Sequence, residues 1–252
     1  MTAHALETVG LVKRFGALTV ADSIDFRLDP GARHALIGPN GAGKTTFINL
    51  IAGRLAPSSG QVRLGGQDVT GLSEAGRVRR GLGRTFQINA LFPDLTVLET
   101  VSLATGERAG TAGTMLRLFG HARGPIEEAH VLLERLGLAD DAAARVGALP
   151  YGKQRLVEIA IALALRPKVL LLDEPAAGVP KAESGIILDV IAGLPQEIAV
   201  LMIEHDMDLV FRFASRITVL ARGAILAEGT PAEIAADPAV RDVYLGERAR
   251  HD

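Results

Sequence analysis

A glycine-rich turn at residues 36 to 46, LIGPNGAGKTT, carries residue types that bind phosphate. Gly38 is followed after four residues by Gly43, Lys44 and Thr45, between a predicted strand and a predicted helix. Glycines let successive backbone N–H groups curl around an anion, and a helix that begins near Lys44 adds its positive end. Lys44 can reach the β- and γ-phosphates of a nucleotide, and the Thr45 hydroxyl can reach Mg²⁺. The pattern predicts a P-loop. Its predicted nucleotide-binding residues are Gly38, Pro39, Asn40, Gly41, Ala42, Gly43, Lys44, Thr45 and Thr46.

Two carboxylates end the apolar run VLLLDEP at residues 169 to 175. Asp173 is expected to hold the Mg²⁺ shell, and Glu174 beside it can polarise an attacking water. Alone, such a pair is as often a solvated strand end as a functional site. The P-loop in the same chain favours the functional interpretation.

Two further polar residues follow short predicted strands. The run LMIEHD ends in Glu204, His205 and Asp206, and His205 can hydrogen-bond a γ-phosphate or a water. Gln87 ends the run RTFQ, and its carbonyl can touch Mg²⁺ or water. The predicted catalytic residues are thus Glu174, His205, Gln87 and Lys44, and the predicted metal-binding residues are Thr45, Gln87 and Asp173.

The elements that must position these residues follow from the apolar patterns. β-rich runs separated by Gly and Pro turns fill the first third of the chain and predict an antiparallel layer before a buried strand at residues 35–38. Helix-period segments fill residues 94–166, apart from a Gly/Ala/Arg-rich loop at residues 105–124. The apolar runs at residues 168–175 and 198–206 predict parallel strands whose carboxyl ends line a ligand crevice.

These patterns predict an α/β protein of the P-loop NTPase (RecA-like) class, with a mixed core sheet, an N-terminal antiparallel β layer and an inserted α-helical subdomain. We expect a single domain over residues 1–252, in which residues 1–87 and 168–252 form the core with its antiparallel β subdomain. Residues 88–167 are expected to form the helical subdomain.

The bulk composition excludes several other classes. A formal net charge of −2 gives no electrostatic footprint for nucleic acid, although Arg77, Arg79, Arg80 and Arg84 cluster locally. The chain has no cysteine, which excludes disulfides and thiolate metal sites. Its longest apolar stretch, residues 159–165, is far shorter than the roughly 18 residues that span a bilayer. We therefore expect no nucleic-acid partner and only peripheral membrane association.

Taken in order, these motifs resemble the ATP-binding subunit of an ABC transporter over essentially the whole chain. KRF at residues 13–15 is similar to the adenine-stacking loop, with Phe15 on the base, and residues 38–46 are similar to the Walker A motif. The remaining correspondences are Gln87 with the Q-loop, Leu149 to Lys153 with the signature, Val169 to Asp173 with Walker B, Glu174 with the catalytic glutamate and His205 with the switch histidine.

The resemblance implies a head-to-tail pair of ATP-binding subunits, in which the signature of one subunit caps the ATP held by the other. The signature residues that would contribute to ATP binding are Leu149, Pro150, Tyr151, Gly152 and Lys153. This signature lacks the usual serine, because Pro150 stands in its place. Lys153 is a cation at a predicted helix start, where the dipole disfavours it. We interpret the γ-phosphate on the neighbouring subunit as its compensating anion, with a solvated surface lysine as the alternative.

Details of these motifs resemble the branched-chain (hydrophobic) amino acid importer subfamily. They are PYGKQR around the signature, DEPAAGVP with Pro180 at the usual D-loop aspartate position, IEHDM, and VYLGE near the C-terminus. The resemblance implies ATP and Mg²⁺ as cofactors, transmembrane permease subunits and an extracytoplasmic solute-binding protein as partners, and a location at the cytoplasmic face of the membrane. Three alternatives stay open: a lipopolysaccharide-export ATPase, a P-loop kinase whose helical lobe is a lid, and a non-transport ATP switch.

Overall fold

The computed structural model describes residues 3–85, 91–110 and 123–248. The chain divides into two compact units. Unit 1 comprises Met1–Leu82, Lys168–Glu174 and Pro195–Asp252, and unit 2 comprises Gly83–Pro167 and Pro175–Leu194. The subdomain boundaries expected from the sequence stay predictions.

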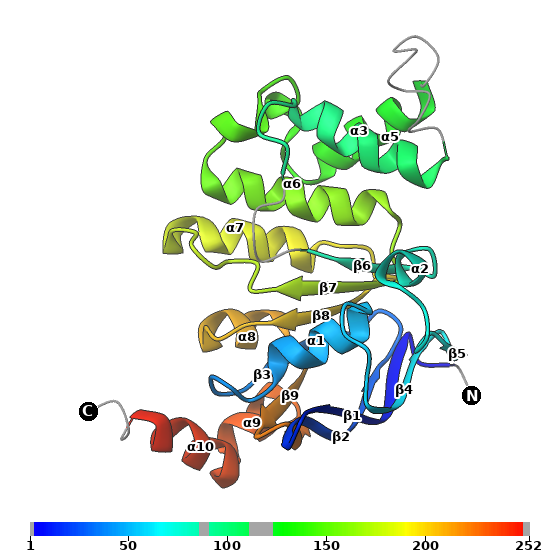
Figure 1. Cartoon of the computed structure of the whole chain (residues 1–252). Coiled ribbons are helices and arrows are strands. Elements are labelled where there is room, and N and C mark those ends of the chain that lie inside the picture. The colour runs from blue at the N-terminus through cyan, green and yellow to red at the C-terminus, as the bar shows by residue number, and fades with distance from the viewer. Residues whose placement is uncertain (1–2, 86–90, 111–122, 249–252) are drawn as a thin grey trace. The chain divides into compact units, whose positions relative to one another are not determined.

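An antiparallel sheet of four strands in the order β2-β1-β4-β5 forms one layer of unit 1 (Figure 1). Its strands are β1 (Leu6–Phe15), β2 (Leu18–Leu28), β4 (Ser59–Leu64) and β5 (Gln67–Asp68). Along β2 the side chains of Ile24, Phe26 and Leu28 are buried, and the residues between them are exposed. This alternation buries one face of the sheet and leaves the other in water. The predicted N-terminal antiparallel layer is confirmed.

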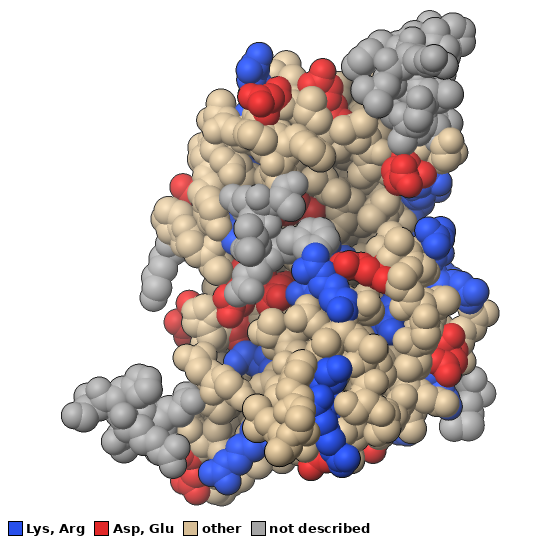
Figure 2. Space-filling model, viewed as in Figure 1, with Lys and Arg blue, Asp and Glu red and all other residues tan. Residues whose placement is uncertain are grey.

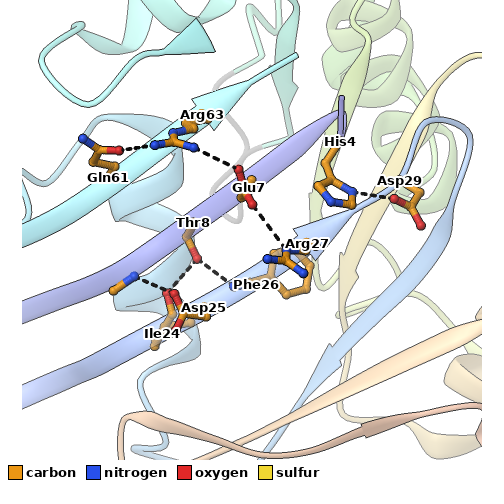
Figure 3. Close-up of polar contacts among 11 residues, drawn as sticks. His4, Glu7, Thr8, Ile24, Asp25, Phe26, Arg27, Asp29, Gln61 and Arg63 are labelled. Atoms are coloured by element: carbon orange, nitrogen blue, oxygen red, sulfur yellow. Dashed lines mark hydrogen bonds and ion pairs between the residues drawn. The ribbon is translucent and has the colours of Figure 1, made fainter. Parts of the chain in front are cut away.

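Polar contacts tie the strands of this layer together (Figure 3). The Glu7 carboxylate on β1 lies 3.3 Å from Arg27 Nε on β2 and 3.5 Å from an Arg63 nitrogen on β4. The buried Thr8 hydroxyl donates to Ile24 O at 2.9 Å and accepts from Phe26 N at 3.1 Å. Because β1 lies between β2 and β4, these contacts link it to both neighbouring strands.

The second sheet has six strands in the order β10-β9-β3-β8-β7-β6. Its strands are β3 (Arg33–Ile37), β6 (Leu82–Arg84), β7 (Val169–Asp173), β8 (Ala199–Ile203), β9 (Arg216–Ala221) and β10 (Ala224–Gly229). The β9–β3–β8–β7 pairings are parallel, and β10 pairs antiparallel with β9. Every residue of β7 and β8 is buried, as expected for central strands covered on both faces. This mixed sheet confirms the predicted α/β fold class.

Helix α1 (Lys44–Ala52) packs into the core that the two sheets of unit 1 share. Phe26 of β2 meets Phe47 of α1 edge to face, with ring centroids 5.6 Å apart. The other helices of unit 1 are α2 (Glu74–Val78), α8 (Met207–Phe213), α9 (Pro231–Ala236) and α10 (Pro238–Arg248). Near the C-terminus, a glycine turn joins β9 to β10, and Pro231 begins α9. In the described part of the chain, no helix is long and apolar enough to cross a membrane.

The structure places one member of the sequence's arginine cluster inside the protein. Arg77 on α2 is 1% exposed, and its Nη1 donates to Leu50 O and Ile51 O, both at 2.6 Å. Its Nη2 donates to Thr70 O at 2.8 Å. Arg77 therefore supplies donors to carbonyls in the last turn of α1, where the helix itself provides few. On the face drawn in Figure 2, acidic and basic side chains are interspersed.

Unit 2 consists mainly of helices, drawn from green to yellow in Figure 1. They are α3 (Val97–Arg108), α5 (Arg123–Arg135), α6 (Tyr151–Ala164) and α7 (Lys181–Ala192), with the 3₁₀ turns η1 (Ala139–Asp141) and η2 (Val146–Ala148). Thr96 and Glu99 form a capping box at the start of α3. The predicted loop near residues 105–124 is shorter at both ends, because α3 continues to Arg108 and α5 starts at Arg123, and residues 111–122 lie outside the described part of the chain. Thr105, which is buried, donates to Pro125 O at 2.9 Å and holds these two helices together.

A buried histidine in unit 1 makes the stability of this unit depend on pH. His34 on β3 is 1% exposed, and its Nε2 lies 2.8 Å from Thr218 Oγ1. Thr218 donates its hydroxyl proton to Glu228 at 2.9 Å, so His34 Nε2 must carry the proton that joins it to Thr218. Burial lowers the pKa of His34 from 6.5 to about 4, partly offset by the nearby Glu228. The imidazole is therefore neutral in the folded protein at pH 5.

We expect acidification from pH 7 to pH 5 to reduce the free energy of unfolding of unit 1. The unfolded chain binds a proton at His34 near pH 6.5, and the folded chain does so only near pH 4. The contribution of His34 to the free energy of unfolding therefore decreases as the pH drops from about 6.5 to about 4. The expected loss by pH 5 is about 2 kcal/mol. Urea unfolding at both pH values measures it. His34→Gln should remove this component, and His130→Gln, which deletes an exposed imidazole, serves as the control. An unchanged pH dependence in His34→Gln would contradict the assignment.

Candidate functional site

The carboxyl ends of three parallel strands lie level with one another in unit 1. Leu36 of β3 and Asp173 of β7 both pair with Ile203 of β8, so these three residues form one row across the sheet. Neighbouring strands lie about 4.8 Å apart, so the row spans roughly 10 Å. The P-loop, Glu174, and the segment from Glu204 to His205 all leave the sheet directly beyond this row. The fold thus brings together the predicted phosphate-binding loop, both carboxylates and the histidine at one edge.

The backbone of the P-loop is packed against strands of both sheets. Gly38 has φ +154°, and a Cβ on it would lie 2.1 Å from Leu220 O. Gly43 has φ +102°, and a Cβ there would lie 2.6 Å from Val20 O. Gly223 N donates to Ala42 O at 2.9 Å and fixes the loop from the β9–β10 turn. Glycine at positions 38 and 43 is therefore required by close backbone contact as well as by conformation.

We expect Gly43→Ala to weaken nucleotide binding at least tenfold, whereas Gly41→Ala has a smaller effect. Gly41 also has a positive φ, +75°, but a Cβ on it meets nothing within 4 Å. Its substitution costs only backbone strain of about 1–2 kcal/mol. Gly43→Ala adds the clash with Val20 O, which the strand holds in place. Fluorescence titration with a labelled nucleotide measures both affinities. Equal affinities of the two variants would show that the close contact at Gly43 does not matter.

Lys44 begins helix α1 and folds back over the loop. Its Nζ donates to Gly38 O at 2.6 Å and to Pro39 O at 3.0 Å. The first turn of α1 contains no acidic residue, and its N-cap is Gly43. A cation, a positive helix end and a curled glycine backbone therefore converge at one point. This arrangement favours an anionic group with several oxygens, as a nucleotide phosphate chain has.

Asp173 and Thr45 fit a divalent metal that is also held by phosphate. Asp173 is 4% exposed at the end of β7, and Thr45 is an exposed residue in the first turn of α1. Among the residues that the structure describes, no group of three or more His, Cys, Asp or Glu side chains could hold a metal. One carboxylate and one hydroxyl leave most positions to phosphate and water. That donor set is typical of Mg²⁺ at nucleotide sites.

Glu174 lies at the point where the chain leaves β7, with an unusual backbone conformation. Its φ is +48°, and its N–H donates to Ile203 O at 3.0 Å. Strained conformations of this kind persist where the surroundings fix them, and they concentrate at functional sites. One Glu174 carboxylate oxygen lies 3.7 Å from His205 Nδ1. The predicted base and the predicted histidine are therefore neighbours.

Glu204 is a buried carboxylate between the apolar strand β8 and His205, with no role predicted from the sequence. It is 2% exposed, and one of its oxygens accepts from His205 N at 3.0 Å and from Asp206 N at 3.4 Å. The same oxygen lies 3.7 Å from His205 Nδ1. Asp206 then caps helix α8. Glu204 thus fixes the backbone that presents His205, and its place at the end of an apolar run was the available signal.

Phe15 lies at the end of strand β1, at the tip of the hairpin formed with β2. It is 50% exposed, which is unusual for a large aromatic side chain. Its ring faces the Lys13 ammonium, which lies 5.1 Å from the ring centroid. An exposed ring on a fixed hairpin can stack on a planar base.

In unit 2, Leu149 to Lys153 form the start of helix α6. Pro150 is the N-cap residue, and Tyr151, Gly152 and Lys153 form the first turn. Lys153 Nζ donates to both carboxylate oxygens of Asp141, at 2.9 and 2.7 Å. Lys153 therefore has a compensating anion within its own subunit, and its contact with a γ-phosphate on a neighbouring subunit stays a prediction. The 3₁₀ turn η1 brings Asp141 close, which the spacing of twelve residues did not reveal.

Tyr151 and Gly152 are packed against the segment that follows Glu174 in the chain. A Cβ on Gly178 would lie 3.1 Å from the Tyr151 ring, and a Cβ on Gly152 would lie 2.6 Å from Glu183 Oε2. The Tyr151 hydroxyl accepts from Arg155 Nη2 at 2.7 Å. These contacts fix the start of α6 within unit 2. Gln87, predicted to touch metal or water, lies outside the described residues.

The parallel sheet, its crossover helices and the loop at its carboxyl edge define a P-loop nucleotide-binding protein. A family described as ABC transporter matches residues 21–177, more than half of the chain. A second, described as branched-chain amino acid ATP-binding cassette transporter, matches residues 224–250. The chain belongs to the ABC transporter family, as one of its ATP-binding proteins. Such proteins hydrolyse ATP to power transport.

Relatives that match nearly the whole chain support its place in the ABC transporter family. The high-affinity branched-chain amino acid transport ATP-binding protein BraF of Pseudomonas aeruginosa is 38% identical, over 98% of this chain and 100% of BraF. LivG of Escherichia coli, described in the same words, is 38% identical over 98% of this chain and 100% of LivG. The ribose import ATP-binding protein RbsA 1 of Rubrobacter xylanophilus is also 38% identical, over 88% of this chain but 43% of that protein.

Solved structures support the same fold. An ATP-binding cassette of an ABC transporter in its ADP conformation superposes with a TM-score of 0.84 and 33% identity, covering 97% of this chain and 100% of that one. A nucleotide-free ATP-binding cassette gives a TM-score of 0.82 and 31% identity, covering 97% of this chain and 99% of that one.

Proposed function

We propose that this protein hydrolyses ATP to power the uptake of branched-chain or other hydrophobic amino acids through separate permease subunits. The observation that carries the proposal is the row of Leu36, Ile203 and Asp173, which brings the P-loop and the carboxylates to one edge of a sheet. Full-length similarity to BraF and LivG supports the choice of cargo. The lipopolysaccharide exporter, the kinase and the ATP switch are not favoured by these relatives.

In the proposed reaction, water attacks the γ-phosphorus of ATP and displaces ADP, which leaves with the bridging oxygen. The P-loop N–H groups and Lys44 hold the phosphates, and Asp173 and Thr45 would hold Mg²⁺, which neutralises charge on the β- and γ-phosphates when bound. Glu174 orients the water and accepts its proton, since its carboxylate is near His205 and at the edge of the site. His205, with Nδ1 3.7 Å from Glu174, steadies the γ-phosphate, and we assign Gln87 a contact with metal or water.

The proposed assembly is a head-to-tail pair of ATP-binding subunits, identical or related. In this pair, residues 149–153 of one subunit cover the ATP that the other holds. Membrane permease subunits and an extracytoplasmic solute-binding protein complete the importer. The protein then acts at the cytoplasmic face of the membrane as a peripheral subunit.

Uptake of radiolabelled leucine by the native host tests the proposed cargo. Deletion of this protein should abolish most high-affinity uptake of leucine, isoleucine and valine and leave ribose uptake unchanged. The intact chain should restore uptake, and the Glu174→Gln chain should not. Unchanged leucine uptake, with loss of a different solute, would overturn the proposed cargo and leave the ATPase intact.

A further inference from the structure

The tip of the β1–β2 hairpin presents two large apolar side chains to solvent. Phe15 and Leu18 are cross-strand partners in this hairpin, 50% and 64% exposed. Gly16, with φ +58°, forms the tight turn between them together with Ala17. Exposed apolar groups are informative when they adjoin a site.

The position of this tip relative to the phosphate loop is fixed within unit 1. The Val20 carbonyl on β2 is the group that a Cβ on Gly43 would strike. Asp22 N donates to Gly223 O at 2.8 Å, and Gly223 N in turn donates to Ala42 O at 2.9 Å. The hairpin that carries Phe15 is therefore tied to the loop that would bind the phosphates.

Lys13 holds the end of β1 from the other side. Its Nζ donates to Ala56 O at 2.8 Å, so the side chain is anchored to the segment after α1. Two backbone groups reinforce this attachment: Ser58 N donates to Val12 O at 2.7 Å, and Arg14 N donates to Ser58 Oγ at 3.0 Å. The anchored ammonium lies 5.1 Å from the centroid of the Phe15 ring, within the range of a cation–π contact.

We propose that Lys13 is a positioning residue for base recognition: it holds Phe15 by one ring face so that the other face stacks on the base of ATP. The inference rests on the proposed function, because it assumes that the P-loop holds a nucleotide. An anchored ammonium restricts rotation of the ring before the base arrives, so less side-chain entropy is lost on binding. Lys13 would then contribute to the affinity for the base and nothing to the affinity for the phosphates.

Two ligands separate these contributions: ATP, and inorganic tripolyphosphate, which has the phosphates but no base. Lys13→Met should raise the KM for ATP roughly two- to fivefold, the range of a cation–π contact at an exposed site, with kcat unchanged. The inhibition constant of tripolyphosphate should stay at its original value. Lys13→Arg keeps a cation that can face the ring and should restore the KM. Arg27→Met, which removes a charge from the same sheet at a side chain 70% exposed, is the matched control.

Three outcomes would overturn the inference. An unchanged KM in Lys13→Met means that Phe15 needs no support. Equal weakening of ATP and tripolyphosphate means that Lys13 acts on the whole loop through the fold. A failure of Lys13→Arg to restore the KM means that the cation over the ring is irrelevant. If the unsubstituted protein binds tripolyphosphate but not ATP, or binds neither, the proposed function itself fails.

Discussion

Glu174→Gln is expected to reduce the turnover of ATP by roughly 10²- to 10⁴-fold and to leave ATP affinity nearly unchanged. The carboxylate lies beyond β7 with one oxygen 3.7 Å from His205, and the phosphate-binding groups belong to a different loop. An amide of the same shape can still orient a water but cannot accept its proton. Phosphate release measures turnover, and nucleotide titration measures affinity.

The same variant tests the proposed pairing of subunits. With ATP bound and not hydrolysed, two subunits should stay associated, so size-exclusion chromatography should show a dimer that depends on ATP. Glu197→Gln, an exposed carboxylate elsewhere in unit 1, should behave as the unsubstituted protein in both assays. A Glu174→Gln protein that turns over at the original rate would remove Glu174 from the mechanism. One that stays monomeric with ATP would count against the composite site.

Arg77→Met is expected to destabilise unit 1 by roughly 3 kcal/mol or more. The substitution removes charge-assisted hydrogen bonds to Leu50 O, Ile51 O and Thr70 O. These buried carbonyl oxygens then lack the donors that Arg77 supplied. Burial lowers the pKa of the Arg77 guanidinium, and the nearby Asp68 offsets part of this effect. Because α1 follows the P-loop directly, loosening its end should also raise the KM for ATP.

Urea unfolding measures this effect, and two further variants sharpen it. Arg54 lies just beyond the end of α1 and forms an exposed ion pair with Glu74. Arg54→Met should therefore reduce the free energy of unfolding by less than about 1 kcal/mol. Arg77→Lys keeps the charge without the forked geometry, so it should recover only part of the loss. If Arg77→Met and Arg54→Met have equal cost, the buried contacts contribute nothing specific.

The sequence predicted the parts of this fold that depend on local pattern. Apolar runs ending in Asp173 and His205 predicted strands whose polar ends share an edge, and the pairing of Leu36 and Asp173 with Ile203 agrees with that prediction. The predicted antiparallel layer followed from alternation such as that of β2. Such signals are carried by consecutive residues, so they need no knowledge of the folded chain.

Contacts between residues that are far apart in the sequence cannot be predicted from local patterns. The sequence groups Arg77 with Arg79, Arg80 and Arg84, and nothing near it in sequence shows that the end of α1 lies against it. The pairing of Lys153 with Asp141 is not apparent from the sequence, since Asp141 becomes its neighbour only through the turn η1. Glu204 needed the backbone geometry around His205 to show its function. In each case the contact that defines the role of the residue forms only in the folded chain.

The amide bridge from Ala42 through Gly223 to Asp22 has a kinetic consequence. It consists of two successive backbone hydrogen bonds that connect the P-loop, the β9–β10 turn and the β1–β2 hairpin. Opening the loop would require breaking bonds that also belong to the junction of both sheets, so such opening should be a rare event. Nucleotide exchange should therefore proceed through a preformed cradle, at a rate set by release of the phosphates rather than by unfolding of the loop.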